Sequence, residues 1–388
     1  MARASISPTV LKWARERSLF DLERLAKKIP VKSQKITLWE EGDEKPTFKQ
    51  AQKLAQILHI PFGYLFLPHP PKEKLPIPDL RTIYDEYRED YSLNLKETIL
   101  DVLRKQDWYI DYLMEEERES LPFIGRFDVS QDTDIIAKDI ISTLELSIED
   151  RLTAPNWEEF LRLLMDRAEK NGIWIMRNGK VGNNTHRILD VEEFRGFVIC
   201  DPIAPVIFLN GADAKAAQIF TLAHELTHLW LGESGVSNVG VRFRPSDIQN
   251  VIERKCNEVA AEVLVPQTLL AKYWQESRVN MENIESLCST FRVSSIVIAR
   301  RAFDLGLLSR AEFFDYYKHQ QERWRSQKEA QKSGGSFYRA LPIVNGRRFT
   351  EAVLQSVYSQ KTLIRDGARL LGIKPSKMDR IAEEVNLL

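Results

Sequence analysis

The stretch at residues 224–228 reads His-Glu-Leu-Thr-His and lies inside an apolar segment that runs from about 219 to 231. On an α-helix, residues four apart lie on the same face, so His224 and His228 can bind one metal ion together. Glu225 lies beside them and can accept a proton from water at the metal. The alternative is a buried amphipathic helix whose histidines only form hydrogen bonds. Because the chain has six histidines in 388 residues, this spacing is a rare chance event, which favours the metal site.

A zinc site with two histidines needs at least one more protein ligand, and a catalytic site also keeps a position for water. The metzincin motif would continue with Gly and His at positions 231 and 234. This chain has Leu231 and Ser234 there, which excludes that class.

The remaining common solution is a carboxylate on a following helix. The predicted helix at 252–266 carries Glu253, Glu258 and Glu262, and all three compete as the third ligand. Glu253 and Asn257 share a face, so one can bind the metal while the other hydrogen-bonds the site. The spacing favours Glu253 and places the other two acids on a separate stripe.

The two segments together resemble the ImmA/IrrE metallopeptidases, in which a Glu, an Asn four later, an Ala-rich stretch and a Leu-x-Pro ending follow the H-E-x-x-H helix. Here these residues are Glu253, Asn257, Ala260-Ala261 and Leu264-x-Pro266. The resemblance implies Zn²⁺ as cofactor, Glu253 as third ligand and a protein substrate of the repressor or antitoxin-like kind. Cys256 stands where the family usually has Ala, and we interpret it as a small packing residue.

The predicted fold class is mainly α within α+β: a zincin-like domain with a small sheet, between helical N-terminal and C-terminal regions. Short strands are expected at 172–176, 197–200 and 205–210, and one of them is expected to hold an extended substrate by strand addition. One long helix is expected at 93–117 and two more within 133–171. Residues 233–249 are predicted to form a loop. The resemblance covers roughly residues 80–388.

The N-terminal segment carries a separate signal. A short helix at 21–28 is followed by a predicted Ser-capped helix from Ser33 that Gly42 ends, and Pro46 is expected to open another helix. The pattern resembles the Cro/CI-type helix-turn-helix of phage repressors, with Trp39-Glu40-Glu41-Gly42 as its most specific mark. The resemblance implies double-stranded DNA as partner, and the residues expected to face base edges are Ser33, Gln34, Lys35 and Thr37.

The charge of this segment agrees with phosphate contact. Residues 1–68 hold twelve Lys/Arg and seven Asp/Glu, whereas the whole chain has a net charge of −1. A homodimer is expected, since one such module reads few base pairs. The alternative is a helical bundle that docks a protein.

Composition divides the chain into five segments. They are a helix-turn-helix domain at 1–68, a Pro-rich linker at 69–80, a metallopeptidase domain at 81–275, a helix-turn-helix-like region at 276–332 and a small helical region at 333–388. In the fourth segment, Arg292, Arg300 and Arg301 either meet nucleic acid or belong to a packed bundle, and we favour the bundle. The chain has no stretch of eighteen apolar residues, which argues against a membrane partner. Three scattered cysteines argue for a reducing cytoplasm.

The sequence therefore predicts a zinc-dependent endopeptidase joined to a DNA-binding domain. The expected role is transcription regulation by cleavage of a repressor or antitoxin-like protein in a phage, mobile-element or stress circuit. Two rivals stay open. One is a regulator whose metal site is structural, and the other is an antitoxin whose large domain holds a toxin without turnover.

Overall fold

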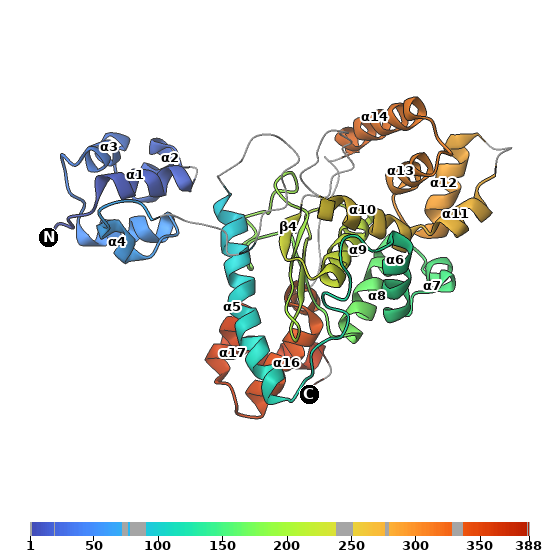
Figure 1. Cartoon of the computed structure of the whole chain (residues 1–388). Helices are drawn as coiled ribbons and strands as arrows, with labels where there is room; N and C mark the ends of the chain where they lie inside the picture. The colour runs from blue at the N-terminus through green and yellow to red at the C-terminus, as the bar shows by residue number, and fades with distance from the viewer. Residues whose placement is uncertain are drawn as a thin grey trace. The chain divides into compact units, whose positions relative to one another are not determined.

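The computed structural model describes residues 2–18, 20–71, 77, 91–237, 251–275, 279–327, 337–385 and 387. The chain divides into two compact units (Figure 1). Unit 1 comprises residues 1–76 and 88–99, and unit 2 comprises residues 77–87 and 100–388. Most of the predicted Pro-rich linker lies outside the described residues.

The described part of residues 1–71 in unit 1 contains four short α-helices and a 3₁₀ turn. They are α1 (Pro8–Arg17), α2 (Leu22–Lys28), α3 (Ser33–Glu41), α4 (Phe48–Ile57) and η1 (Phe62–Phe66). Their core is apolar and includes Leu25, Ile36, Trp39 and Leu54, each of which is at most 1% exposed. The guanidinium of Arg15 on α1 donates to both carboxylate oxygens of Glu40 on α3, at 2.7 and 3.0 Å, which joins the two helices.

The helix caps of unit 1 correct two expectations. Lys32, not Ser33, is the N-cap of α3, no side chain caps that helix end, and Ser33 is the first helical residue. Pro46 does not open α4, because Thr47 caps it in a reciprocal pair with Gln50. The predicted C-terminal glycine is confirmed, since Gly42 adopts φ 88°.

Unit 2 contains the part of the long helix α5 (Leu93–Glu115) from Leu100 onward. Three helices follow where two were expected: α6 (Thr133–Thr143), α7 (Ile148–Thr153) and α8 (Trp157–Lys170). The extra break has a local cause. Glu145 has a φ of 52°, which ends α6, and the Asn156 side chain then caps the start of α8 after Pro155.

The strands β1 (Trp174–Asn178), β2 (Gly196–Ile199), β3 (Val206–Asn210) and β4 (Gly235–Ser237) form one sheet in the order β1-β3-β2-β4. β1 pairs parallel with β3, and the other pairs are antiparallel. The three predicted strands are present within two residues of their expected bounds. The fourth strand lies in the segment that we expected to be a loop, and residues 238–250 lie outside the described part.

Every residue of β2 and β3 is buried, because both faces of the sheet are covered. Ile175 of β1 belongs to the core shared with helices α8 and α9 (Lys215–Leu231). Its neighbour Trp174 points to the opposite face, where it stacks on Phe349 at 4.6 Å and meets Tyr109 of α5. The sheet is therefore a central layer between two sets of helices.

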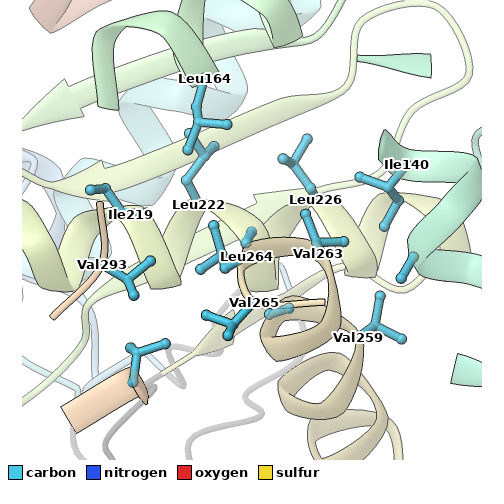
Figure 2. Close-up of a cluster of buried hydrophobic side chains, with 14 of the residues drawn as sticks. Ile140, Leu164, Ile219, Leu222, Leu226, Val259, Val263, Leu264, Val265 and Val293 are labelled. Carbon is cyan, nitrogen blue, oxygen red and sulfur yellow. The ribbon is translucent and has the colours of Figure 1, made fainter. Parts of the chain in front are cut away.

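The main core of unit 2 lies around α9 and the helix α10 (Val251–Leu264). Figure 2 shows Ile219, Leu222 and Leu226 of α9 gathered with Val259 and Val263 of α10, all at most 2% exposed. Figure 1 shows α6 and α8 beside these two helices. This packing fixes α9 and α10 against each other, and both carry predicted site residues.

The rest of unit 2 is helical. The remaining elements are α11 (Gln267–Tyr273), α12 (Asn280–Phe291), α13 (Ser295–Asp304), α14 (Arg310–Gln327), α15 (Phe337–Asn345), α16 (Arg347–Tyr358), α17 (Ile364–Leu371), η2 (Pro375–Lys377) and α18 (Met378–Glu384). The described helices α15 to α18 all lie within the small helical region predicted at 333–388. The predicted fold class, mainly helical with a small sheet, is confirmed. Across the described residues, no helix has the length and apolar character needed to cross a membrane.

The arginines of the fourth predicted segment have internal partners. Arg301 on α13 forms an ion pair with Glu262 and donates to the carbonyl of Val265 at 3.1 Å. Arg292 donates to the carbonyl of Arg151 at 3.3 Å. Because Arg301 is 8% exposed, it is not available to nucleic acid, and its role is to join α13 to the end of α10.

Candidate metal centre

The helix α9 is held in place at its start by the turn that leaves β3. Asn210 donates to the carbonyl of Phe194 at 3.1 Å and accepts from the amide of Ala212, so one side chain shapes the turn. Asp213 pairs with Arg195 at 2.9 Å. These contacts fix where α9 begins relative to the sheet.

The end of α9 is anchored by the segment before α6. The amide of Gly125 donates to the carbonyl of Leu229 at 2.9 Å, which satisfies a backbone group left free at the helix end. The indole of Trp230 stacks on Phe123 at 4.4 Å and donates to Asp139 at 2.6 Å. The helix then ends at Gly232, whose φ of 73° suits glycine.

His224 and His228 lie one turn apart on this anchored helix, and both are fully buried. Their Nε2 atoms are 3.1 Å apart. The carboxylate of Glu253 on α10 lies 3.2 Å from Nε2 of His224 and 3.1 Å from Nε2 of His228. The structure thus brings together three of the predicted site residues, with two imidazoles and one carboxylate pointing at a common point.

Asn257 lies one turn after Glu253 on α10. Its amide oxygen is 3.2 Å from Nδ1 of His224. An amide oxygen only accepts hydrogen bonds, so Nδ1 carries a proton, and Nε2 is the ring atom that faces Glu253. The corresponding Nδ1 of His228 has no hydrogen-bond partner among the described residues.

The two competing acids of α10 lie elsewhere. Glu258 is near Arg254 and Thr133, at 3.7 and 3.5 Å. Glu262 pairs with Arg301 and accepts from the amide of Gln267 at 3.0 Å. Neither carboxylate has a contact with the histidines.

Cys256 lies between Glu253 and Asn257 in sequence and is fully buried. Its Sγ and one ring nitrogen from each of His224 and His228 all lie within 4.8 Å of one another. Burial, together with the charges of Glu253 and Glu225, raises the pKa of the Cys256 thiol well above its usual value. A packing role accounts for the burial of Cys256 but does not explain why its sulfur lies beside the two imidazoles.

The protonation states follow from burial and mutual contact. Burial would raise the pKa of Glu253, but the adjacent His224 and His228 outweigh it and lower this pKa to about 2. Burial lowers the pKa of His228. Burial also lowers the pKa of His224, but the charge of Glu253 and its hydrogen bond, together with Glu225 and Asn257, outweigh burial and raise this pKa.

Glu225 is fully buried beside this cluster. Neither of its carboxylate oxygens has a hydrogen-bond partner among the described residues. Burial raises its pKa to about 8; the charge of His224 lowers this pKa, the charge of Glu253 raises it, and the nearby Ser237 hydroxyl of β4 lowers it. A buried carboxylate without partners is costly for a protein that uses it only for structure.

Two residues next to Glu225 escaped the sequence analysis. Gly196 of β2 faces α9, and a Cβ atom there would lie 2.8 Å from Oε1 of Glu225 and 2.7 Å from Thr221. Ser237 is paired with Gly196 across the sheet. A glycine in a strand often marks a close approach, but Gly196 lies one residue before the predicted strand at 197–200, so this signal was missed.

The expected substrate-holding strand needs a correction. β2 and β3 are paired on both sides, so neither can accept an added strand. β1 is at an edge, but Gly346 lies against it, close to the carbonyl of Ile175. Within the described residues, β4 is paired on one side only, and it is the strand beside Glu225.

The predicted DNA-contact residues all lie on the first half of α3 in unit 1. Gln34 is exposed, and Ser33, Lys35 and Thr37 are partly exposed. Lys35 lies 3.5 Å from Glu44 in a solvent-facing ion pair. Ile36 and Trp39 of the same helix are buried in the core of unit 1.

The donor set can be compared with the needs of a zinc ion. Ligand atoms of a tetrahedral zinc site with nitrogen and oxygen donors are about 3.3 Å apart, as follows from metal–ligand bonds of about 2.0–2.1 Å. The Nε2 atoms of His224 and His228 are 3.1 Å apart, and the Glu253 carboxylate places Oε2 at 3.2 Å from the first and Oε1 at 3.1 Å from the second. The two carboxylate oxygens of Glu225 next to them have no hydrogen-bond partner among the described residues, which agrees with a site that also holds a metal ion and water. The residues fit the metal.

Comparison with known proteins agrees with this geometry. A peptidase family model described as the IrrE N-terminal-like domain matches residues 168–303, which include β1 to β4, α9 and α10. Residues 345–384 match a Domain of unknown function (DUF8813).

A curated protein is also similar. It is the Radiation response metalloprotease IrrE of Deinococcus radiodurans, with 36% identity over 74 residues. The match covers 19% of this chain and 23% of that protein, so the chain spans about a quarter of the relative's length.

Proposed function

We propose that this chain is a zinc-dependent endopeptidase whose metal ligands are His224, His228 and Glu253. One observation carries the proposal: the three donors converge within 3.2 Å of one another, beside a buried glutamate whose oxygens have no partner among the described residues. Similarity to the IrrE N-terminal-like peptidase domain supports it.

Each residue then has a defined task. When bound, Zn²⁺ acidifies water and polarises the scissile carbonyl. Glu225 accepts the proton of the attacking water and delivers it to the leaving amine. To accept a proton, Glu225 must be ionised. Burial favours its protonated form, whereas the charge of a Zn²⁺ ion held by the three ligands would favour the ionised form. Asn257 is the residue that orients His224.

The substrate would lie along β4. An extended peptide can add to a strand edge through backbone hydrogen bonds, which tolerate many sequences. Ser237 of β4 lies beside Glu225, so a peptide on this edge passes close to the proposed base. The proposed substrate is a repressor or antitoxin-like protein, and cleavage of such a protein would change transcription in a phage, mobile-element or stress circuit.

The test compares the zinc-loaded protein with its Glu225→Gln variant. Both are incubated with lysate of the source cells, with and without DNA, and new peptide termini are mapped. New termini should appear with the wild-type protein and fall by roughly two to four orders of magnitude in rate with Glu225→Gln, which removes the proton acceptor but no ligand. Equal cleavage by both proteins would reject the mechanism.

A second function is proposed for unit 1. The exposed polar start of α3, together with five more basic than acidic residues in segment 1–68, favours double-stranded DNA as its partner. A homodimer would let two modules read paired half-sites. The test is salt-dependent binding of the full chain to selected and random DNA duplexes, and binding that is absent at low salt would reject it.

A further inference from the structure

We propose that Cys256 is a fourth, displaceable ligand of the metal centre, which closes the site in the resting protein. The proposal rests on the metal centre proposed above. It assigns to this chain a donor set of two imidazoles, one carboxylate and one thiolate.

The position of Cys256 is the first argument. It lies three residues after Glu253 on α10, so both side chains leave the same region of the helix surface. Its Sγ and a ring nitrogen of each histidine lie within 4.8 Å of one another. In a tetrahedral site a sulfur and a nitrogen ligand are about 3.5 Å apart, so a movement of at most about 1.3 Å brings the sulfur to that spacing.

The surroundings of Cys256 are the second argument. Its side chain belongs to the apolar core on one side, as a buried free cysteine often does. On the other side, its Sγ and one ring nitrogen of each of the two imidazoles lie within 4.8 Å of one another. A residue present only for packing would gain nothing from these polar neighbours.

The chemistry of zinc is the third argument. Thiolate is among its preferred ligands, and four protein ligands are the mark of a closed site, whereas a catalytic site keeps one position open. The ligand exchange is balanced: the Cys256 thiol loses its proton to solvent, its sulfur takes the fourth position, and one water leaves. A substrate carbonyl or water reaches that position only after the sulfur has moved away.

The experiment uses the full chain, stripped of metal by a chelator and reloaded with one equivalent of Co²⁺. Cobalt bound by thiolate absorbs in the near ultraviolet through sulfur-to-metal charge transfer, which nitrogen and oxygen ligands do not produce. The wild-type protein and a Cys288→Ser control, changed on α12 outside the cluster, should show this band. Cys256→Ser and Cys256→Ala should bind Co²⁺ in the same amount and lack the band.

Two further measurements sharpen the result. The zinc affinity of both Cys256 variants, measured by chelator competition, should fall by about tenfold or more, since even residues that only support ligands contribute that much. Acetohydroxamate, which needs open metal positions, should abolish the band in the wild-type protein. A band that persists at saturating acetohydroxamate would contradict a displaceable ligand.

The outcomes separate the two proposals. Equal spectra for wild type and both Cys256 variants, with one Co²⁺ bound in each, would overturn the fourth ligand and leave the three-ligand centre intact. Failure of the wild-type protein to bind Co²⁺ would overturn both.

Discussion

The amide oxygen of Asn257 lies 3.2 Å from Nδ1 of His224 and thereby directs Nε2 of that ring toward Glu253. Glu253 and Asn257 are one turn apart on α10, so a single helix face supplies both the carboxylate and the group that orients its partner. The position of this face depends on the end of α10, where Arg151 donates to the carbonyls of Val263 and Leu264 at 2.7 and 2.6 Å.

Asn257→Ala should therefore weaken zinc binding without abolishing it. Loss of a hydrogen bond that orients a metal-binding histidine costs roughly 10- to 100-fold in affinity. The measurement is chelator competition on purified protein. Glu258→Ala, on the next residue of the same helix, is the matched control and should change the affinity little. Equal effects of the two substitutions would mean that Asn257 does not support the site.

The ligand set makes a stronger prediction. Wild type should hold about one zinc per chain, and His228→Ala and Glu253→Ala should release it, whereas Glu225→Gln and Glu262→Gln should retain it. Elemental analysis after dialysis gives the stoichiometry. Stoichiometric zinc in His228→Ala would refute the assignment, and its loss from Glu262→Gln alone would move the third ligand.

The sequence was informative where local spacing decides the geometry. The one-turn spacing of His224 and His228 predicted their common direction, and the spacing of Glu253 and Asn257 predicted their shared face. It failed where a contact depends on residues far apart. The strand β4 is only three residues long and owes its conformation to pairing with β2, so no periodicity marks it.

The same reason applies to Cys256. Its burial in the apolar core agrees with the packing role expected from its residue type, but its distance from the histidines could not be predicted, because it depends on how α9 packs against α10. Ser33 is a residue type that often caps helices, but the chain enters α3 one residue earlier, at Lys32. The boundaries of the five predicted segments stay a prediction.

Gly196→Ala should disturb the site from the sheet side. The new methyl group would lie 2.7 Å from Cγ2 of Thr221 and 2.8 Å from Oε1 of Glu225, too close for either, so α9 or the carboxylate must shift. We expect a loss of about 1–3 kcal/mol in the free energy of unfolding. Peptidase activity should fall as well. Urea unfolding measures the loss of stability, and a peptide-cleavage assay measures the loss of activity.

Gly63→Ala is the matched control for this substitution, because a Cβ atom at Gly63 has no neighbour within 4 Å. It should leave the unfolding of unit 2 unchanged. A Gly196→Ala protein as stable and active as the control would show that β2 and α9 can separate without cost.

Glu169 predicts a pH dependence away from the metal centre. Burial raises its pKa to about 8, although its carboxylate accepts from the amide of Arg347 at 3.0 Å. The charges of Asp166 and Glu351 raise this pKa further, and that of Arg347 lowers it. The folded state thus holds the proton more tightly than the unfolded state, whose pKa is near 4.5.

The stability from this proton is fully present below about pH 4.5 and is lost as pH rises through about 8, at up to about 1.4 kcal/mol per pH unit. Glu169→Gln keeps an acceptor for Arg347 and removes the titration. Between pH 6 and pH 8, the wild-type free energy of unfolding should therefore fall by about 1–3 kcal/mol more than that of the variant. Parallel pH profiles for the two proteins would refute the assignment.

The proposed DNA contacts of unit 1 can be separated by two pairs of substitutions. Gln34 and Lys35 lie at the start of α3, and Lys49 and Lys53 lie exposed on α4. The ion pair of Lys35 with Glu44 is solvent-facing and therefore weak, so it does not prevent Lys35 from meeting a base.

Gln34→Ala and Lys35→Ala should relax sequence preference by about 1–3 kcal/mol per lost base contact. Lys49→Ala and Lys53→Ala should at most weaken binding evenly across sequences and lower the slope of affinity against salt. Selection from a random duplex pool, repeated for each variant, measures both effects. If the wild-type protein selects no sequence, or if the α3 variants select the same one as wild type, docking of a partner protein becomes the better account of unit 1.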